Sequence, residues 1–146
     1  MMFATITRME YEQYAAKFFV QPVPEPRFDF TGLFGTTLFY KDFEAAVVYF
    51  TAVFGPPAYV EGAGTRGWPI GDGWLTLLQA QAGNPQNVEI TFTVSTPAEA
   101  ERLHTAFIQA GGQGEVPSNQ LMYAPIRYCS VTSPQGTRLL IISPLP

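Results

Sequence analysis

Few residues of this sequence belong to the types that carry most enzyme chemistry. The chain has a single histidine, His104, and a single cysteine, Cys129. A divalent metal site usually needs three or four ligands, and imidazole is the commonest neutral one. A catalytic serine would have only His104 as its base, and no serine lies in a nucleophile-elbow sequence. Cys129 lies in the strand-like stretch RYCSV, which predicts a buried structural thiol rather than a nucleophile.

The scattered charge argues against a nucleic-acid partner, and the lack of long apolar runs argues against a membrane partner. The formal net charge is −4, and the eight Lys and Arg residues are scattered with no two adjacent. The N-terminus lacks the long apolar run of a signal peptide, and no stretch approaches the roughly 18 apolar residues that span a bilayer. One cysteine excludes a disulfide within the chain, so we expect a reducing, cytoplasmic location.

The low charge content hints at a covered surface. Charged residues make up 14% of the chain, compared with about a quarter in typical domains. Either a subunit partner or folding around a cavity would explain this composition.

Residues 1–31 are predicted to form an arm in front of a domain at 32–146. Residues 8–19 favour a short helix, and the stretch VQPVPEP at 20–26 favours an extended chain. The arm is either a loose terminus or a segment that packs on a partner subunit. We favour the second because it carries several aromatic side chains: Phe18, Phe19, Phe28 and Phe30.

The stretch 33–81 predicts a strand, a helix and three more strands. GTTLFYK alternates with the period of a strand, and Asp42 is a good N-cap for a helix at 43–54. Gly55 can take the left-handed conformation that ends this helix. The three further strands are predicted at 58–62, 65–70 and 73–81, the last two joined by a GDG turn.

The stretch 88–146 repeats this order. Thr96 and Glu99 form a predicted capping box between a strand at 88–95 and a helix that ends near Ala110. The following strands are predicted at 113–118, 121–131 and 137–143. Alignment of the two units brings Thr37 onto Thr91 and Ala46 onto Ala100, a pattern typical of an old internal duplication.

Two stretches resemble the vicinal oxygen chelate superfamily, which includes glyoxalase I, extradiol dioxygenases and fosfomycin- and bleomycin-resistance proteins. FYKDFEAAVVYFTAVFG is similar to the first strand and helix of that superfamily, and TSPQGTRLLIISP is similar to its final hairpin. Ser133 stands where an aspartate is common. The resemblance covers residues from about 33 to 146. It implies an α+β fold in which two βαβββ modules, 33–81 and 88–146, form one curled eight-stranded mixed sheet around a cleft, with the helices outside.

The resemblance also locates the metal ligands that such proteins use, one from each of four strands. The corresponding positions here are Gly35, Thr76, Glu89 and Leu140, and only Glu89 is a usual ligand. The resemblance therefore implies a cleft with no metal in the usual site, and we expect no cofactor.

Strand alternation from Gly35 defines a wall for this cleft. The positions predicted to face inward are Thr37, Phe39, Thr76, Leu78, Glu89, Thr91, Thr93, Arg138, Leu140 and Ile142. The aromatic residues predicted to flank its mouth are Trp68, Trp74, Tyr123 and Tyr128, each of which could instead fill the core. From these sets the ligand-binding candidates are Thr37, Phe39, Trp74, Thr76, Glu89, Thr91, Tyr123, Arg138 and Leu140.

Glu89 is the one candidate for catalysis. A carboxyl group among apolar side chains has a raised pKa, which would suit a general base. The alternative is an ion pair with Arg138 or Arg127 that closes the floor of the pocket, and we favour it because structural networks also hold such groups.

Three functions remain open. The first is a metal-free protein of the bleomycin-resistance type that binds a small organic molecule, and we expect it to be a homodimer in view of the sparse charge. The second is a lyase or isomerase with Glu89 as its base. The third is a protein-interaction module with a collapsed cleft and an adhesive arm. We favour the first, so we lean against an enzyme.

Overall fold

The computed structural model describes residues 5–31 and 35–146, and its strands form two sheets. β1 runs parallel to β4, and the other neighbours in the first sheet are antiparallel. The helix α2 (Phe43–Phe54) follows β1 in the chain. The strands of this sheet lie in the spatial order β1 (Thr36–Tyr40), β4 (Gly73–Gln79), β3 (Thr65–Ile70) and β2 (Tyr59–Val60).

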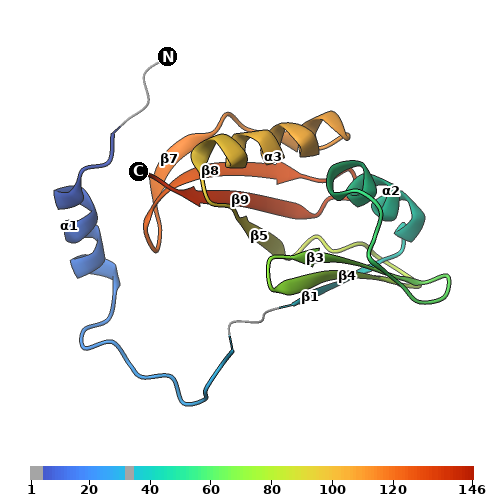
Figure 1. The fold of residues 1–146 in the computed structure, drawn as a ribbon, viewed down its shortest axis with the longest axis horizontal. Coiled ribbons are helices and arrows are strands. Elements are labelled where there is room, and N and C mark those ends of the chain that lie inside the picture. The colour runs from blue at the N-terminus through green and yellow to red at the C-terminus, as the bar shows by residue number, and fades with distance from the viewer. Residues whose placement is uncertain (1–4, 32–34) are drawn as a thin grey trace.

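The second sheet has the same topology (Figure 1). Its one parallel pair is again formed by its first and last strands, β5 and β9, and the helix α3 (Pro97–Gln109) follows β5. A short strand, β7 (Ser118–Leu121), also pairs with β8. The spatial order is β5 (Glu89–Thr93), β9 (Arg138–Pro144), β8 (Pro125–Thr132) and β6 (Gln113–Gly114).

The prediction of one eight-stranded sheet is wrong in two respects. The described residues form nine strands, because the segment predicted at 113–118 splits into β6 and β7, which pair with opposite ends of β8. Pro117 lies at this break and has no N–H to donate to a ladder. In addition, β1 and β5 each pair with one neighbour, so no ladder in the described part of the chain joins the two sheets.

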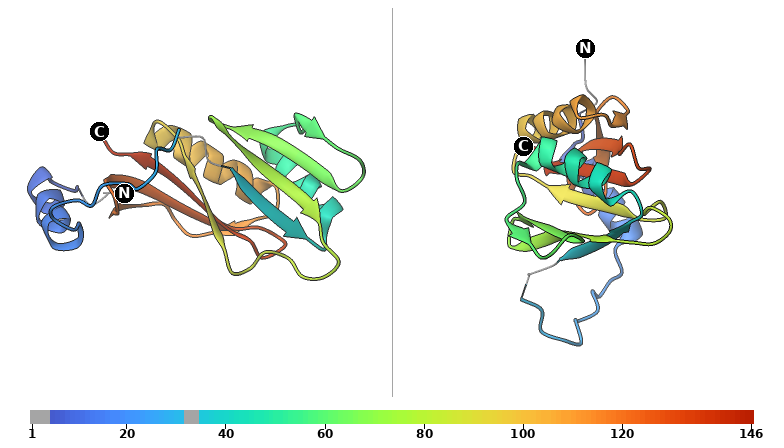
Figure 2. Two further views of the ribbon diagram at one scale, coloured as in Figure 1. Left: turned by 90° about the horizontal axis from the view of Figure 1, so that it is seen from below. Right: turned by 90° about the vertical axis from the view of Figure 1, so that its right-hand side faces the viewer.

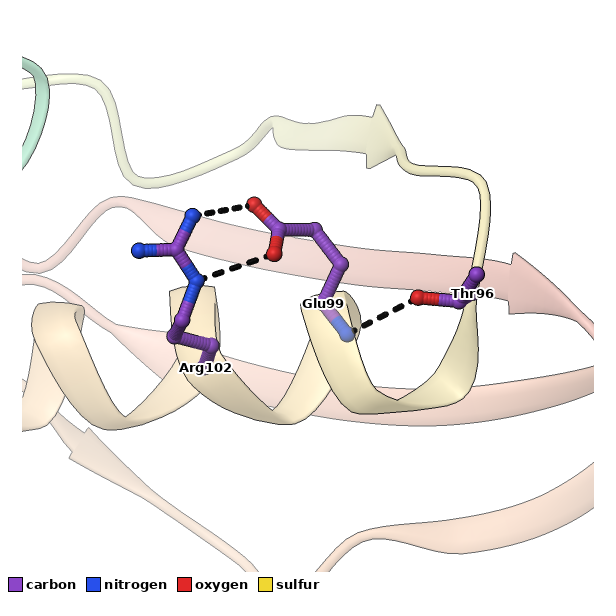
Figure 3. Close-up of polar contacts among 3 residues, drawn as sticks. All are labelled: Thr96, Glu99 and Arg102. Atoms are coloured by element: carbon purple, nitrogen blue, oxygen red, sulfur yellow. Dashed lines mark hydrogen bonds and ion pairs between the residues drawn. The ribbon is translucent and has the colours of Figure 1, made fainter.

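Local signals set the helix ends, with two differences from prediction. Thr96 caps α3 by accepting a hydrogen bond from the Glu99 N–H at 3.1 Å, but the Glu99 carboxylate binds Arg102 at 2.6 and 2.9 Å instead of reaching back to Thr96 (Figure 3). Asp42 precedes α2 without capping it through its side chain. Its carboxylate instead accepts a hydrogen bond from Asn84 at 2.8 Å, which ties the start of α2 to the loop between the sheets.

One aromatic cluster joins the two halves of the chain. The Phe107 ring of α3 lies 5.5 Å from Phe54 and 6.3 Å from Phe50, both on α2, and 5.8 Å from Phe92 on β5, measured between ring centroids. The Tyr49 hydroxyl of α2 also donates to the Phe107 carbonyl at 2.9 Å. Both helices lie on the same side of the sheets (Figures 1 and 2), so they share one core.

A buried hydrogen bond also joins the two halves. The Tyr40 hydroxyl at the end of β1 lies 2.7 Å from the Thr137 hydroxyl, which precedes β9. Both residues are fully buried. A lost partner here would leave a buried polar group unsatisfied, which costs about 1–3 kcal/mol, so this contact fixes the spacing of the sheets.

The arm extends away from the rest of the chain (Figure 1). Its helix α1 (Arg8–Phe18) has no buried residue and contacts the β7–β8 turn through the Tyr11 hydroxyl, which donates to the Tyr123 carbonyl at 2.7 Å. Phe28 and Phe30 are 76% and 80% exposed. The sequence predicts that the arm ends after residue 31 and that the first module starts at residue 33. Both points lie at or within residues 32–34, which are outside the described residues. None of the helices in the described segments is long and apolar enough to cross a membrane.

The shared core predicts a large loss of stability when Phe107 is truncated. Phe107→Ala should lower the free energy of unfolding by about 3–5 kcal/mol, because it removes a fully buried ring and leaves a cavity between both helices. Denaturant unfolding measures this loss. Val48→Ala on the exposed side of α2 is the control and should change stability by less than about 0.5 kcal/mol. Equal stability of the two variants would contradict a core shared by the two halves.

Candidate functional site

A cavity of about 260 Å³ lies where the two sheets meet. We call it the inter-sheet cavity. Its wall is mostly apolar, with two threonines, one carboxylate and one indole. It is lined by Thr36, Ile70, Trp74 and Leu75 from the first sheet and by Glu89, Ile90, Thr91 and Phe92 from β5. Because residues of both halves form it, this cavity exists only as long as the aromatic cluster holds the sheets in place.

Three of the predicted site residues meet in this cavity. Trp74, Glu89 and Thr91 all line it. Trp74 lies at the start of β4, where its ring meets that of Tyr59 edge to face at a centroid distance of 6.5 Å. Gly67 lies beside both rings, since a Cβ atom there would stand 3.3 Å from the Tyr59 Cβ and 3.4 Å from the Trp74 ring. The missing side chain therefore allows the indole to lie close to β3.

Glu89 forms an ion pair across the second sheet. It lies opposite Arg138 in the β5–β9 register, and the Arg138 Nε is 3.8 Å from a carboxylate oxygen of Glu89. The two side chains are 36% and 65% exposed, so the contact is loose and solvated. This partner agrees with the ion-pair alternative. The apolar burial required for a general base is not present around Glu89 in the single chain.

Arg127, the other residue considered as a partner of Glu89, has its own partners on the helix side of the second sheet. It projects toward α3, where it donates to Glu101 at 2.7 and 3.0 Å and to Asn119 at 3.0 Å. Strand alternation explains the difference: Arg127 and the buried Cys129 and Val131 lie on the helix side of β8, whereas Arg138 lies on the opposite face of the sheet.

Other predicted residues lie outside the inter-sheet cavity. Thr37, Phe39 and Thr76 lie on the open face of the first sheet, away from the helices, and Phe39 is 56% exposed. Leu140 faces the same side from the second sheet but is buried. Together they do not converge on one hollow within a single chain.

Two of the four aromatic residues predicted at the mouth are placed differently. Trp68 is a core residue on the helix side, with its indole N–H donating to the Gly55 carbonyl at 2.8 Å. Tyr123 lies in the β7–β8 turn and lines a hollow of about 250 Å³ beneath the arm helix, together with Tyr14 and Phe18. Trp68 pairs with Leu75 and so points to the helix side of the first sheet, whereas Trp74, the residue before Leu75 on β4, points to the open face.

Tyr128 belongs to a second, polar hollow that adjoins the ion pair. This hollow of about 400 Å³ is lined by Glu89, Arg138 and Tyr128 with Gln86, Asn87 and Val88 from the preceding loop. Glu89 therefore borders both the inter-sheet cavity and the polar hollow, and it is the only predicted site residue in the described chain to do so.

Sequence reasoning missed Thr36, Ile70, Leu75, Ile90 and Phe92 as lining residues. Alternation assigned Leu75, Ile90 and Phe92 to the helix side of the sheets, which is where they are buried. They nevertheless border the cavity because it opens between one end of the first sheet and the edge strand β5 rather than on one sheet face. No signal within either strand marks such a position.

The described residues contain no group of three or more His, Cys, Asp and Glu side chains that could hold a metal ion. His104 is the one histidine of the chain and therefore its one possible imidazole ligand. It is buried on α3, and its Nε2 lies 3.0 Å from the Ser130 carbonyl oxygen on β8. It therefore fixes the helix on the sheet.

Burial controls the ionisation of several side chains behind the site. Desolvation raises the pKa of the Cys129 thiol from 9.0 to about 11. Desolvation also raises the pKa of the Tyr40 hydroxyl, against a smaller lowering by its hydrogen bond to Thr137, and it raises the pKa of Tyr49. A fully buried thiol that resists ionisation matches the predicted structural role of Cys129.

No family model matches the sequence, and neither does any curated protein. Solved structures do match. A glyoxalase/bleomycin resistance protein from Albidiferax ferrireducens T118 is 15% identical, with a TM-score of 0.64 over 76% of this chain and 97% of that one. Lactoylglutathione lyase from Agrobacterium tumefaciens is 18% identical, with a TM-score of 0.62 over 80% and 96%.

The fosfomycin resistance protein FosX from Mesorhizobium loti is 16% identical, with a TM-score of 0.58 over 80% of this chain and 95% of that one. These likenesses show that the chain shares the fold of these glyoxalase and resistance proteins. Some of these neighbours are named as enzymes and others as resistance proteins.

The raised pKa of Cys129 predicts alkaline destabilisation. Folding favours the protonated thiol, so its contribution is complete below pH 9 and is lost as pH rises from 9 toward 11. The free energy of unfolding should fall across this range by about 2–3 kcal/mol more in the native sequence than in Cys129→Ala. Urea unfolding at stepwise pH measures both. Parallel pH curves for the two proteins would show that the thiol is not held protonated by the fold.

Proposed function

We propose that this chain, which has the glyoxalase and bleomycin-resistance fold, is a metal-free binding protein for a small organic molecule. The observation that carries the proposal is the inter-sheet cavity, where an indole, a carboxylate and hydroxyl groups interrupt an apolar wall. Ligand sites are typically of this composition, mostly apolar with a few polar groups that fix orientation.

The donor set supports binding without a metal. Of the positions that correspond to the superfamily's ligands, Gly35, Thr76 and Leu140 offer no usual metal donor, which leaves the carboxylate of Glu89 alone. A site with one carboxylate and no imidazole is a poor match for the divalent ions that such folds hold.

We also propose that two copies of the chain form the working unit and that the arm, residues 1–31, is an appendage to the domain at 32–146. Phe39, Tyr59 and Trp74 expose 56%, 46% and 43% of their area on the open side of the first sheet. Exposed aromatic side chains on one face of a sheet often mark an interface. A partner over this face would bring Phe39 and Thr76 opposite the ligand-facing residues of a second sheet.

The dimer is tested by light scattering of the full chain. We expect a mass about twice the 16.1 kDa of one chain. Phe39→Lys should shift the protein toward the monomer, because a charge would be buried in the interface. Val48→Lys, on the outer face of α2, is the matched control and should leave the mass unchanged. A native protein with the mass of one chain contradicts the proposal.

The lyase or isomerase alternative rests on one observation, the presence of Glu89 in the cavity wall. The protein-interaction alternative rests on the exposed aromatic residues of the arm. The first requires turnover that depends on Glu89, and the second requires no small ligand at all.

Ligand binding predicts a specific response to substitution of Trp74. In a thermal-shift screen of aromatic antibiotics, thiol conjugates and acyl-CoA compounds, at least one compound should raise the melting temperature of the native protein. Trp74→Ala should lose most of this shift because the indole forms part of the cavity wall. Glu89→Gln should change the affinity by less than about ten-fold.

Tyr123→Ala is the control, since Tyr123 lies at the arm helix rather than in the inter-sheet cavity, and it should keep the full shift. An unchanged shift in Trp74→Ala would place the ligand elsewhere. Turnover that Glu89→Gln abolishes, with affinity retained, would establish the enzyme alternative.

A further inference from the structure

The charge around the inter-sheet cavity points to the chemistry of its ligand. Among the described residues that line it, Glu89 is the only ionisable one, and Thr36 and Thr91 are the only other polar side chains apart from the Trp74 indole N–H. A ligand group that reaches Glu89 therefore meets a carboxylate with no cation in the same wall. The Glu89 carboxylate attracts a positively charged ligand group and repels an anionic one.

The existing partner of Glu89 is easily exchanged. Arg138 stands 3.8 Å from the carboxylate, beyond hydrogen-bond distance, and borders the polar hollow but not the inter-sheet cavity. Exposed pairs of this kind contribute little to stability, and their side chains move freely. The Glu89 carboxylate can turn toward a ligand cation while Arg138 remains solvated.

The aromatic wall strengthens this preference. Trp74 lines the cavity, and indole is the best side chain for binding a cation over its ring face. The Tyr59 ring contacts the Trp74 indole edge to face, and the lack of a side chain at Gly67 lets both rings pack closely against β3. These contacts within the first sheet hold the indole in place. The carboxylate comes from the second sheet. A cation between them would contact both halves of the chain.

The surroundings do not favour an anion. A smaller neighbouring hollow is lined by Glu89, Arg138 and Tyr128. A second acid, Glu115, also lines it. The net charge of the whole chain is −4. Arg138 is thus flanked by carboxylates and is not a free anion site.

From these contacts we infer that the ligand carries a protonated amine or a similar nitrogen cation, which binds Glu89, on an apolar body that lies against Trp74. This inference rests on the proposed binding function and narrows it to one class of ligand.

Three probes that differ only in their end group test the inference: 2-phenylethylamine, 2-phenylethanol and 3-phenylpropanoate. The full chain, labelled with ¹⁵N, has two indole N–H signals, from Trp68 and Trp74. The Trp74 signal reports on the cavity, and the Trp68 signal, whose N–H is bonded to the Gly55 carbonyl, is an internal reference. We expect the amine to bind about three- to ten-fold more tightly than the alcohol, with the carboxylate weakest.

Two variants assign the preference to Glu89. Glu89→Gln should make the amine and the alcohol bind equally. Glu12→Gln removes the same charge from the arm helix and should keep the preference, which excludes a general effect of net charge. Arg138→Gln should strengthen binding of the amine, because it removes the competing guanidinium.

The inference is overturned if the carboxylate binds as tightly as the amine, if Glu89→Gln keeps the preference, or if none of the three probes moves the Trp74 signal. The binding function is judged separately. A neutral or anionic compound from the wider screen that stabilises the native protein through Trp74 would leave that function standing and remove only the assignment of charge.

Discussion

The packing of Phe107 against the rings of α2 and β5 is the contact on which the rest of the structure depends. The two sheets share no hydrogen-bonded ladder in the described residues, so their relative position is set by side chains. The aromatic cluster does this on the helix side, where Phe50, Phe54, Phe92 and Phe107 come from both halves. The Tyr40–Thr137 hydrogen bond adds a buried polar contact between the halves. Close-packed rings and one buried polar contact resist small displacements, because each displacement loses dispersion contacts or a bond.

The inter-sheet cavity follows from this arrangement. One end of the first sheet, where β1 begins and β3 turns into β4, approaches the edge strand β5 without pairing, and the side chains on both sides form the wall of the gap. Trp74 and Glu89 line the same cavity from the two halves because the shared core fixes the sheets. Small changes in core packing should therefore reach the site, which lies on rigid strands rather than on loops.

The scarcity of charge has a structural meaning at this site. Eight basic and twelve acidic residues are spread over the chain, and two of the ion pairs in its described part, Arg8–Glu12 and Arg102–Glu99, are local and exposed. Arg127 differs from these: it is buried beneath α3, and Glu101 pairs with its charge. Glu89 has a partner 3.8 Å away and borders three hollows. Because this ion pair is loose, the Glu89 carboxylate is available for another contact.

The sequence by itself determined the types and order of the elements, the ends of most helices and the chemistry that the chain lacks. Local rules are sufficient for these features, because alternation, capping and turn geometry depend on residues at most a few positions apart. The repeated order of strands and the resemblance of the two motifs were sufficient for the fold. Only the tertiary structure decided that Trp74 lines a cavity while Trp68 fills the core, that Arg127 pairs with Glu101, and that residues 36, 70 and 75 meet residues 89–92. These outcomes depend on how two separately patterned sheets pack through side chains far apart in the chain, and no local periodicity encodes the gap that remains between them.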